Sequence, residues 1–232
     1  MADSQSPEEV RATCHSTMGT ELGELYYLLS NEVTWLYWRW HEYVTLYTES
    51  DRRLEILNSS APFFFYVVQR VLWDETLLGI SRLAGPEATG RKRNLSVHRI
   101  LPFMAGTAVA EKVEALLKEV TEKSASAIDL RNRHIAHRDL DVVLGKAATP
   151  LPQVTKETVD AALAALAALL NAVQSHFQVG TTTAYQFASS PHGAETLLYV
   201  LRDGLKREQA RTKKLEDGIY DPDDWNDRDP PL

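Results

Sequence analysis

The chain contains a single cysteine, Cys14, among its 232 residues. One cysteine excludes an intramolecular disulfide and any cysteine-rich metal cluster, so nothing in the sequence requires an oxidising compartment. The longest uninterrupted apolar runs, Phe63 to Val68 and Ala161 to Leu170, are well short of the roughly 18 residues that indicate a membrane span. The first residues are polar and lack the basic and then apolar pattern of a secretion signal. We therefore expect a soluble, cytoplasmic protein with no membrane contact.

Sequence motifs of metal enzymes and of protein kinases are incomplete. His134 and His137 lie three residues apart and would share a helix face, but no HExxH motif or third ligand accompanies them. The segment HRDL at 137–140 matches the start of a kinase catalytic loop. However, Leu144 stands where that loop requires an asparagine, and the sequence has no glycine-rich loop and no DFG. We expect neither a metal ion nor a cofactor.

The net charge of −7 is concentrated at the carboxyl end. Residues 216–232 hold seven acids and one base, which leaves a net charge of −1 on residues 1–215. Within that nearly neutral body, basic residues cluster at 91–99, 131–138 and 206–214, where they would suit phosphate contacts. The acidic tail contains three prolines and should be extended. It either meets basic surface or a partner, or simply aids solubility.

Hydrophobic periodicity is helical along nearly the whole chain, and no stretch alternates cleanly enough for a strand. The sequence therefore predicts an all-α bundle of long antiparallel helices. Ser59 and Ser60 are candidate caps for the helix that begins near Pro62, and Asn94 or Ser96 for a short one that ends near Pro102. The expected helices span about 7–17, 21–49, 62–83, 94–102, 107–137, 155–177 and 194–214.

Aromatic residues are concentrated in the second of these helices. Residues 26–47 contain eight of the twenty aromatic residues of the chain. So wide an apolar surface on one helix favours burial in the core or in a dimer contact. Stacking on the bases of single-stranded RNA is the alternative use.

The segment RNRHIAHRD at 131–139 packs three arginines and two histidines into nine positions. Arginine supplies a fixed cation and histidine a group that titrates near neutral pH, a combination that suits metal-free chemistry on a phosphodiester. A structural explanation competes, because cations are also favoured at the negative end of a helix dipole.

Two segments resemble a known family. Arg131, Asn132 and His137 fit the pattern of an arginine, a polar residue and a histidine near a helix end that marks the HEPN superfamily. LWDETLLGISRL at 72–83 and LRNRHIAHRD at 130–139 are similar to HEPN proteins of abortive infection, an anti-phage function of bacteria. The resemblance implies a HEPN-like helical domain at 20–180. A short N-terminal helix at 1–19, a helical extension at 181–215 and an acidic flexible tail at 216–232 complete the expected organisation.

The resemblance also implies an activity, namely metal-independent cleavage of RNA in abortive-infection or toxin–antitoxin defence. His137 would be the general base, Arg131 would stabilise the phosphorane, and Asn132 would bind phosphate or fix the arginine. Arg138 and Arg133 would bind flanking phosphates or lie in solvent, and His134 would bind substrate or support the site. Asp74 would orient a catalytic group or pair with a neighbouring arginine on its helix. These roles define the predicted site residues.

The resemblance further implies a homodimer whose motifs face each other across a cleft. Residues six apart on an ideal α-helix are about 120° from a common face, so Arg131 and His137 converge only if the helix frays or a second subunit helps. An antitoxin or another defence protein is a further expected partner. Asp139 stands where some HEPN toxins carry a tyrosine that an antitoxin modifies, which argues against silencing by that modification.

Two other functions remain open at this stage. One is a non-catalytic HEPN module that binds RNA, a nucleotide or a partner protein. The other is a structural helical protein, in which the arginines and histidines only decorate a helix end.

Overall fold

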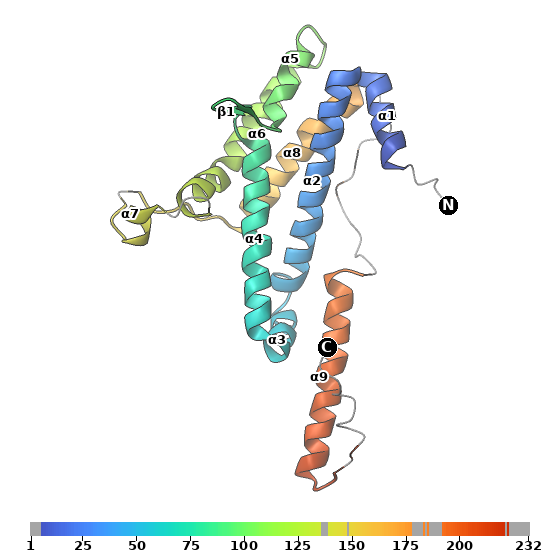
Figure 1. The fold of residues 1–232 in the computed structure, drawn as a ribbon, viewed down its shortest axis with the longest axis vertical. Coiled ribbons are helices and arrows are strands. Elements are labelled where there is room, and N and C mark those ends of the chain that lie inside the picture. Colours follow the sequence, from blue (N-terminus) through green and yellow to red (C-terminus); the bar gives the residue numbers. More distant parts are fainter. Residues whose placement is uncertain are drawn as a thin grey trace. The chain divides into compact units, whose positions relative to one another are not determined.

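The computed structural model describes residues 6–135, 139–147, 149–177 and 192–220, together with 183, 185 and 222. These residues are mostly helical with almost no sheet, which confirms the predicted all-α class (Figure 1). The helices are α1 (Pro7–Met18), α2 (Thr20–Tyr47), α3 (Asp51–Ser60), α4 (Pro62–Ala84), α5 (Leu101–Met104), α6 (Ala110–Leu130), α7 (Leu140–Val143), α8 (Lys156–Phe177) and α9 (Ala194–Glu216). A 3-10 turn, η1 (Val97–Ile100), precedes α5, and a π-helical segment, η2 (Arg131–Ile135), follows α6.

Helix α3 was not predicted, and it changes the explanation of how α4 begins. Its N-cap is Ser50, whose side chain accepts from the backbone N–H of Arg53. Ser59 and Ser60 lie in its last turn, and the hydroxyl of Ser60 donates to the carbonyl of Ile56 at 2.7 Å. The prediction that these serines cap α4 was therefore wrong for Ser60, whose hydroxyl is used inside α3.

A short β-hairpin interrupts the helices between α4 and η1. Strands β1 (Ala88–Thr89) and β2 (Lys92–Arg93) pair antiparallel, with Ala88 opposite Arg93. Gly90 in the turn has φ of 60°, a conformation that glycine adopts without the steric penalty of a side chain. The expectation of no strand was wrong here, because two-residue strands are too short to produce a visible alternation.

The predicted cap at Ser96 is confirmed, since its side chain accepts from the backbone N–H of His98 at the start of η1. Pro102 does not end a helix. It lies in the first turn of α5, where a missing N–H costs nothing.

The described residues form two compact units, which we describe separately. The first contains residues 1–40 and 71–187, and its core is built on α8, which lies beside α6 (Figure 1). Leu163, Leu166, Leu169 and Leu170 of α8 are at most 1% exposed. Helix α8 is long and apolar enough to cross a membrane, but 61% of its apolar window is buried, as in the core helix of a soluble protein.

Helices α2 and α4 pack closely and antiparallel within this unit. A Cβ atom added to Gly79 would lie 2.3 Å from Cδ2 of Leu36, so the glycine allows the two backbones to approach. One end of the contact carries Trp40, whose ring centroid is 5.9 Å from that of Trp73. The indole N–H of Trp40 donates to Asp160 of α8 at 2.6 Å, which joins the three helices.

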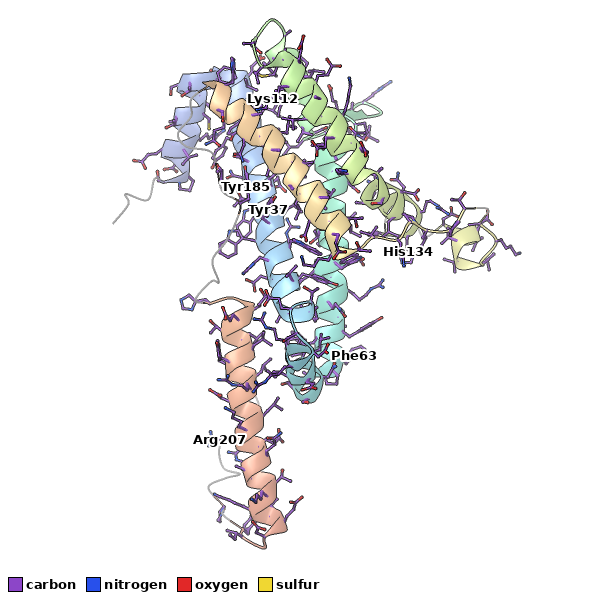
Figure 2. All side chains as sticks on the ribbon, turned by 180° about the vertical axis from the view of Figure 1, so that it is seen from behind. Tyr37, Phe63, Lys112, His134, Tyr185 and Arg207 are labelled. Atoms are coloured by element: carbon purple, nitrogen blue, oxygen red, sulfur yellow. The ribbon has the colours of Figure 1, made fainter. Side chains whose placement is uncertain are left out.

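The aromatic residues of α2 mainly serve the core. Tyr26, Trp40 and Tyr47 are at most 8% exposed, whereas Trp35 is 64% exposed. Tyr37 stacks on Tyr185 with ring centroids 5.2 Å apart (Figure 2). Burial in the core therefore explains the aromatic residues of α2 better than stacking on RNA bases does.

The second unit contains residues 41–70 and 188–232. Within it α9 packs on α3, and the carboxylate of Glu42 accepts from the backbone N–H of Ala194 at the start of α9. The hydroxyl of Tyr47 donates to the carbonyl of Phe65. Most of the predicted acidic tail, from residue 223 onward, lies outside the described residues.

Candidate functional site

The RNRHIAHRD segment begins where α6 changes from α-helical to π-helical geometry. Residues Arg131–Ile135 are π-helical, and π-helical turns within α-helices frequently occur at functional sites. The backbone N–H of Asp139 donates to the carbonyl of Arg133 at 2.9 Å, which brings these two residues together. The predicted base His137 and the predicted phosphate ligand Arg138 lie outside the described residues. The angle of about 120° between Arg131 and His137 was calculated for an ideal α-helix. It does not apply here, because Arg131–Ile135 is π-helical.

Arg131 is oriented by its neighbour in the sequence. Its guanidinium Nη1 donates to Oδ1 of Asn132 at 2.8 Å. Its backbone N–H donates to the carbonyls of Ala127 and Ile128, which ties it to the last turn of α6. Asn132 was predicted either to bind phosphate or to hold Arg131 in place, and this hydrogen bond agrees with the second role.

Arg131 lines a cavity of 340 Å³ that we call the arginine pocket. Two further arginines line it, Arg82 in the last turn of α4 and Arg93 on β2. None of the lining residues is acidic. The remaining polar lining comes from Ser81, Thr89 and Asn94. Three cations among lining residues that include no acid would suit a negatively charged group.

The hairpin that carries Arg93 is held to the chain after α4 by one buried and two exposed hydrogen bonds. The hydroxyl of Ser96 donates to the carbonyl of Gly85 at 2.6 Å. The side-chain amide of Asn94 donates to the carbonyl of Pro86 and to the hydroxyl of Thr89, both at 2.9 Å. These bonds hold the hairpin against the chain that follows α4, and they support the wall of the pocket.

Arg82 and Ser81, near the end of α4, both form polar contacts. Nη2 of Arg82 lies 3.4 Å from the carboxylate of Glu75, which also pairs with Arg39 at 3.5 Å. One carboxylate thus serves two guanidiniums. The buried hydroxyl of Ser81 donates to the carbonyl of Ala127 on α6 at 3.1 Å.

Arg133 is used inside the protein. Its guanidinium donates to Asp129 at 3.3 Å and to the carbonyl of Pro150 at 3.1 Å, and it also bonds to the carbonyl of Thr149. Its side chain is 19% exposed. These acceptors tie the loop that follows α7 to the end of α6, which makes Arg133 a positioning residue in this geometry. Substrate binding by Arg133 stays a prediction.

The other predicted residues lie at different distances from the pocket. His134 is half-buried near the end of η2 (Figure 2). Asp74 is half-buried on α4, seven residues before Ser81, which corresponds to roughly 10 Å along the helix axis. Asp139 caps α7, with its carboxylate accepting from the backbone N–H of Asp141 at 3.0 Å.

Helix α7 exposes apolar side chains directly after the motif segment. Leu140, Val143 and Leu144 are 67%, 60% and 52% exposed. Adjacent exposed apolar residues of this kind often mark a surface that another protein covers.

Two pocket residues were not predicted as site residues, namely Arg82 and Arg93. The sequence offered one signal for Arg93, because it lies in the basic cluster at 91–99. Arg82 gave no such signal, since an arginine in the last turn of a helix is ordinary.

Comparison with protein families supplies one match. A family model of HEPN domains described as AbiU2 matches residues 19–197, from the start of α2 into the first turn of α9. Searches of curated proteins and of solved structures find no match.

Proposed function

Because the chain belongs to the AbiU2 family of HEPN domains, which makes it a HEPN-type abortive-infection protein, we propose that it is a metal-independent endoribonuclease. Its substrate is RNA in the cytoplasm of an infected cell, where cleavage arrests growth. A second protein of the defence system, such as an antitoxin, holds the activity in check.

The proposed reaction uses the ribose 2′-hydroxyl as nucleophile. His137 accepts the proton of this hydroxyl, and its oxygen attacks the adjacent phosphorus. A bond forms between phosphorus and the 2′ oxygen, and the bond to the 5′ oxygen breaks as that oxygen takes up a proton. Arg131 stabilises the charge on the phosphorane by donating hydrogen bonds. The products are a 2′,3′-cyclic phosphate and a 5′-hydroxyl.

The observation that carries the proposal is the setting of Arg131. Its guanidinium is oriented by Asn132 at 2.8 Å and lines a pocket with two other arginines and no acidic residue. A cation that only decorated a helix end would need neither the fixed orientation nor the additional arginines. The arrangement instead suits recognition of a phosphate.

We further propose that the active form is a homodimer. The exposed apolar side chains of α7 follow the motif by only a few residues, so a second copy seated there would bring two motifs together. The second subunit then supplies groups that a single helix end does not align with Arg131.

The first test is cleavage in EDTA. Purified protein is incubated with total transfer RNA and with a labelled single-stranded RNA, beside the variants Arg131→Ala and His137→Ala. We expect fragments with cyclic-phosphate ends from the wild type alone, and no cleavage of a matching single-stranded DNA, which lacks the nucleophile. Lys112→Ala, a variant at an exposed position of α6 outside the arginine pocket and outside the three basic clusters, serves as the control.

Cleavage of the DNA, or a requirement for a divalent ion, would reject the proposed chemistry. No cleavage by a folded dimer that still binds the RNA would favour the alternative, a HEPN module that binds RNA without cutting it.

A further inference from the structure

We propose that Arg93 and Arg82 form a phosphate subsite beside Arg131, which holds a backbone phosphate of the RNA strand next to the one that is cleaved. The inference rests on the proposed function for the role of Arg131. It adds two residues from outside the motif segment, one on the β-hairpin and one on α4.

The charge of the arginine pocket supports this assignment. Three guanidiniums line it, and its lining contains no carboxylate to neutralise them. The neighbouring carboxylate of Glu75 is divided between Arg82 and Arg39. A planar guanidinium matches two phosphate oxygens, and charge-assisted bonds of this type are among the strongest available.

Arg93 also lines a second cavity, whose wall includes Glu21, Glu24 and Glu87, but it forms no ion pair with them. Within the described part of the chain its guanidinium forms no hydrogen bond or ion pair, and its side chain is exposed. Arg82 does have a structural role, because a cation in the last turn of a helix stabilises the helix dipole. Arg93 is therefore the residue that discriminates between a binding site and a structural cluster.

The hairpin places Arg93 at the wall of the pocket. Successive side chains of a strand point to opposite faces, so Lys92 and Arg93 of β2 diverge. Arg93 lines the pocket and Lys92 does not. The bonds from Asn94 to Pro86 and Thr89 hold the hairpin in place.

The lining of the pocket favours a backbone phosphate over a base. Its volume of 340 Å³ falls in the range of roughly 300–1,000 Å³ that is typical of small-ligand sites. No aromatic ring lines it, so it lacks the surface on which proteins usually stack an RNA base. Contacts to phosphates position a strand without reading its sequence, and we expect binding here to be independent of sequence.

The test measures binding to a strand that cannot be cleaved. The probe is a fluorescein-labelled single-stranded RNA with 2′-O-methyl groups on every ribose, followed by fluorescence anisotropy over a series of salt concentrations. The proteins are the full-length wild type, Arg93→Ala, Arg82→Ala and Lys92→Ala. Lys92→Ala removes the same charge from the neighbouring residue on the other face of the strand, which makes it the matched control.

We expect Arg93→Ala to weaken binding on the order of tenfold, as for the loss of one charge-assisted hydrogen bond. The slope of log affinity against log salt should become shallower by about 0.7, the value for one phosphate contact on a single strand. Arg82→Ala should behave similarly, and Lys92→Ala should leave the slope unchanged. ATP at the concentration of the probe should not displace it.

Equal effects of Arg93→Ala and Lys92→Ala would overturn the subsite, as would absence of binding by the wild type. Displacement by equimolar ATP would assign the pocket to a free nucleotide and overturn the strand assignment. Because the probe is not cleaved, the outcome is separate from that of the nuclease test. A selective effect of Arg93→Ala in a protein that cuts no RNA would reject the nuclease and retain the subsite.

Discussion

The hydroxyl of Ser81 on α4 donates to the carbonyl of Ala127 on α6 at 3.1 Å. The same carbonyl accepts the backbone N–H of Arg131, the first residue of the motif segment. One oxygen thus connects the wall of the arginine pocket to the arginine proposed to bind phosphate. The connection is buried, since Ser81 is 8% exposed.

Ser81→Ala should lower the free energy of unfolding by about 1 kcal/mol, because it removes one buried hydrogen bond between two helices. The carbonyl of Ala127 keeps the N–H of Arg131 as its partner, which limits the loss. Urea unfolding followed by circular dichroism measures the change. An unchanged unfolding midpoint would show that the bond does not contribute in solution.

Ser124→Ala should have the opposite effect. Ser124 on α6 is fully buried, and its hydroxyl has no hydrogen-bond partner among the described residues. A buried polar group without a partner costs about 1–3 kcal/mol, so its replacement by a methyl group should raise the free energy of unfolding or leave it unchanged. The same urea experiment applies, and a clear loss of stability would reveal a hidden partner of the hydroxyl.

Arg133→Ala should release the segment between α7 and α8. The variant loses the bonds to Asp129, Thr149 and Pro150, so chymotrypsin should cut after Leu144 faster than in the wild type. RNA cleavage should fall by at least about tenfold, because displacement of a catalytic group by a small distance is costly.

Arg133→Lys should not rescue either property, since a lysine cannot bond to several acceptors in the same fixed geometry. The salt dependence of RNA binding decides between the two roles of this residue. An unchanged slope in Arg133→Ala fits a positioning residue, whereas a shallower slope would show that Arg133 contacts phosphate.

Stability should fall in alkali because of Tyr37. Burial, together with the charge of Asp160, raises the pKa of Tyr37 from 10.0 to about 12. The folded state therefore favours the neutral phenol, and its stabilising contribution is complete below pH 10 and is lost as the pH rises through 12. Urea unfolding midpoints across this window should fall less for Tyr37→Phe than for the wild type. Tyr66→Phe, at an exposed position of α4, is the control.

Much of the helical framework is predictable from the sequence because long apolar stripes and capping residues mark it. The stripe of α2 and the alanine-rich segment of α8 predict both helices to within a few residues. Helix α3 was missed because its ten residues, DRRLEILNSS, are mostly polar and follow the preceding helix after only a short turn. It packs against α9, which lies far away in the sequence, and local sequence patterns do not reveal such a contact.

The candidate site was only partly predictable for a related reason. The motif segment is continuous in sequence, so Arg131 and Asn132 are visible as neighbours. Arg82 lies on α4 and Arg93 on the hairpin. Tertiary structure places them in one pocket with Arg131, and no local sequence pattern predicts this arrangement. The hydrogen bonds from Arg133 to the carbonyls of Thr149 and Pro150 also depend on tertiary structure.

The π-helical segment η2 sets how the motif responds to a change in chain length. A π-helical turn accommodates a surplus residue that an α-helix would not, so the excess is stored where Arg131 stands. Removing one residue between Arg131 and Ile135 would let the helix return to α geometry. The residues on either side of the segment would then keep their directions, because the π-helical turn absorbs the surplus residue. A relative that lacks one residue here should therefore continue α6 as a regular α-helix in place of η2.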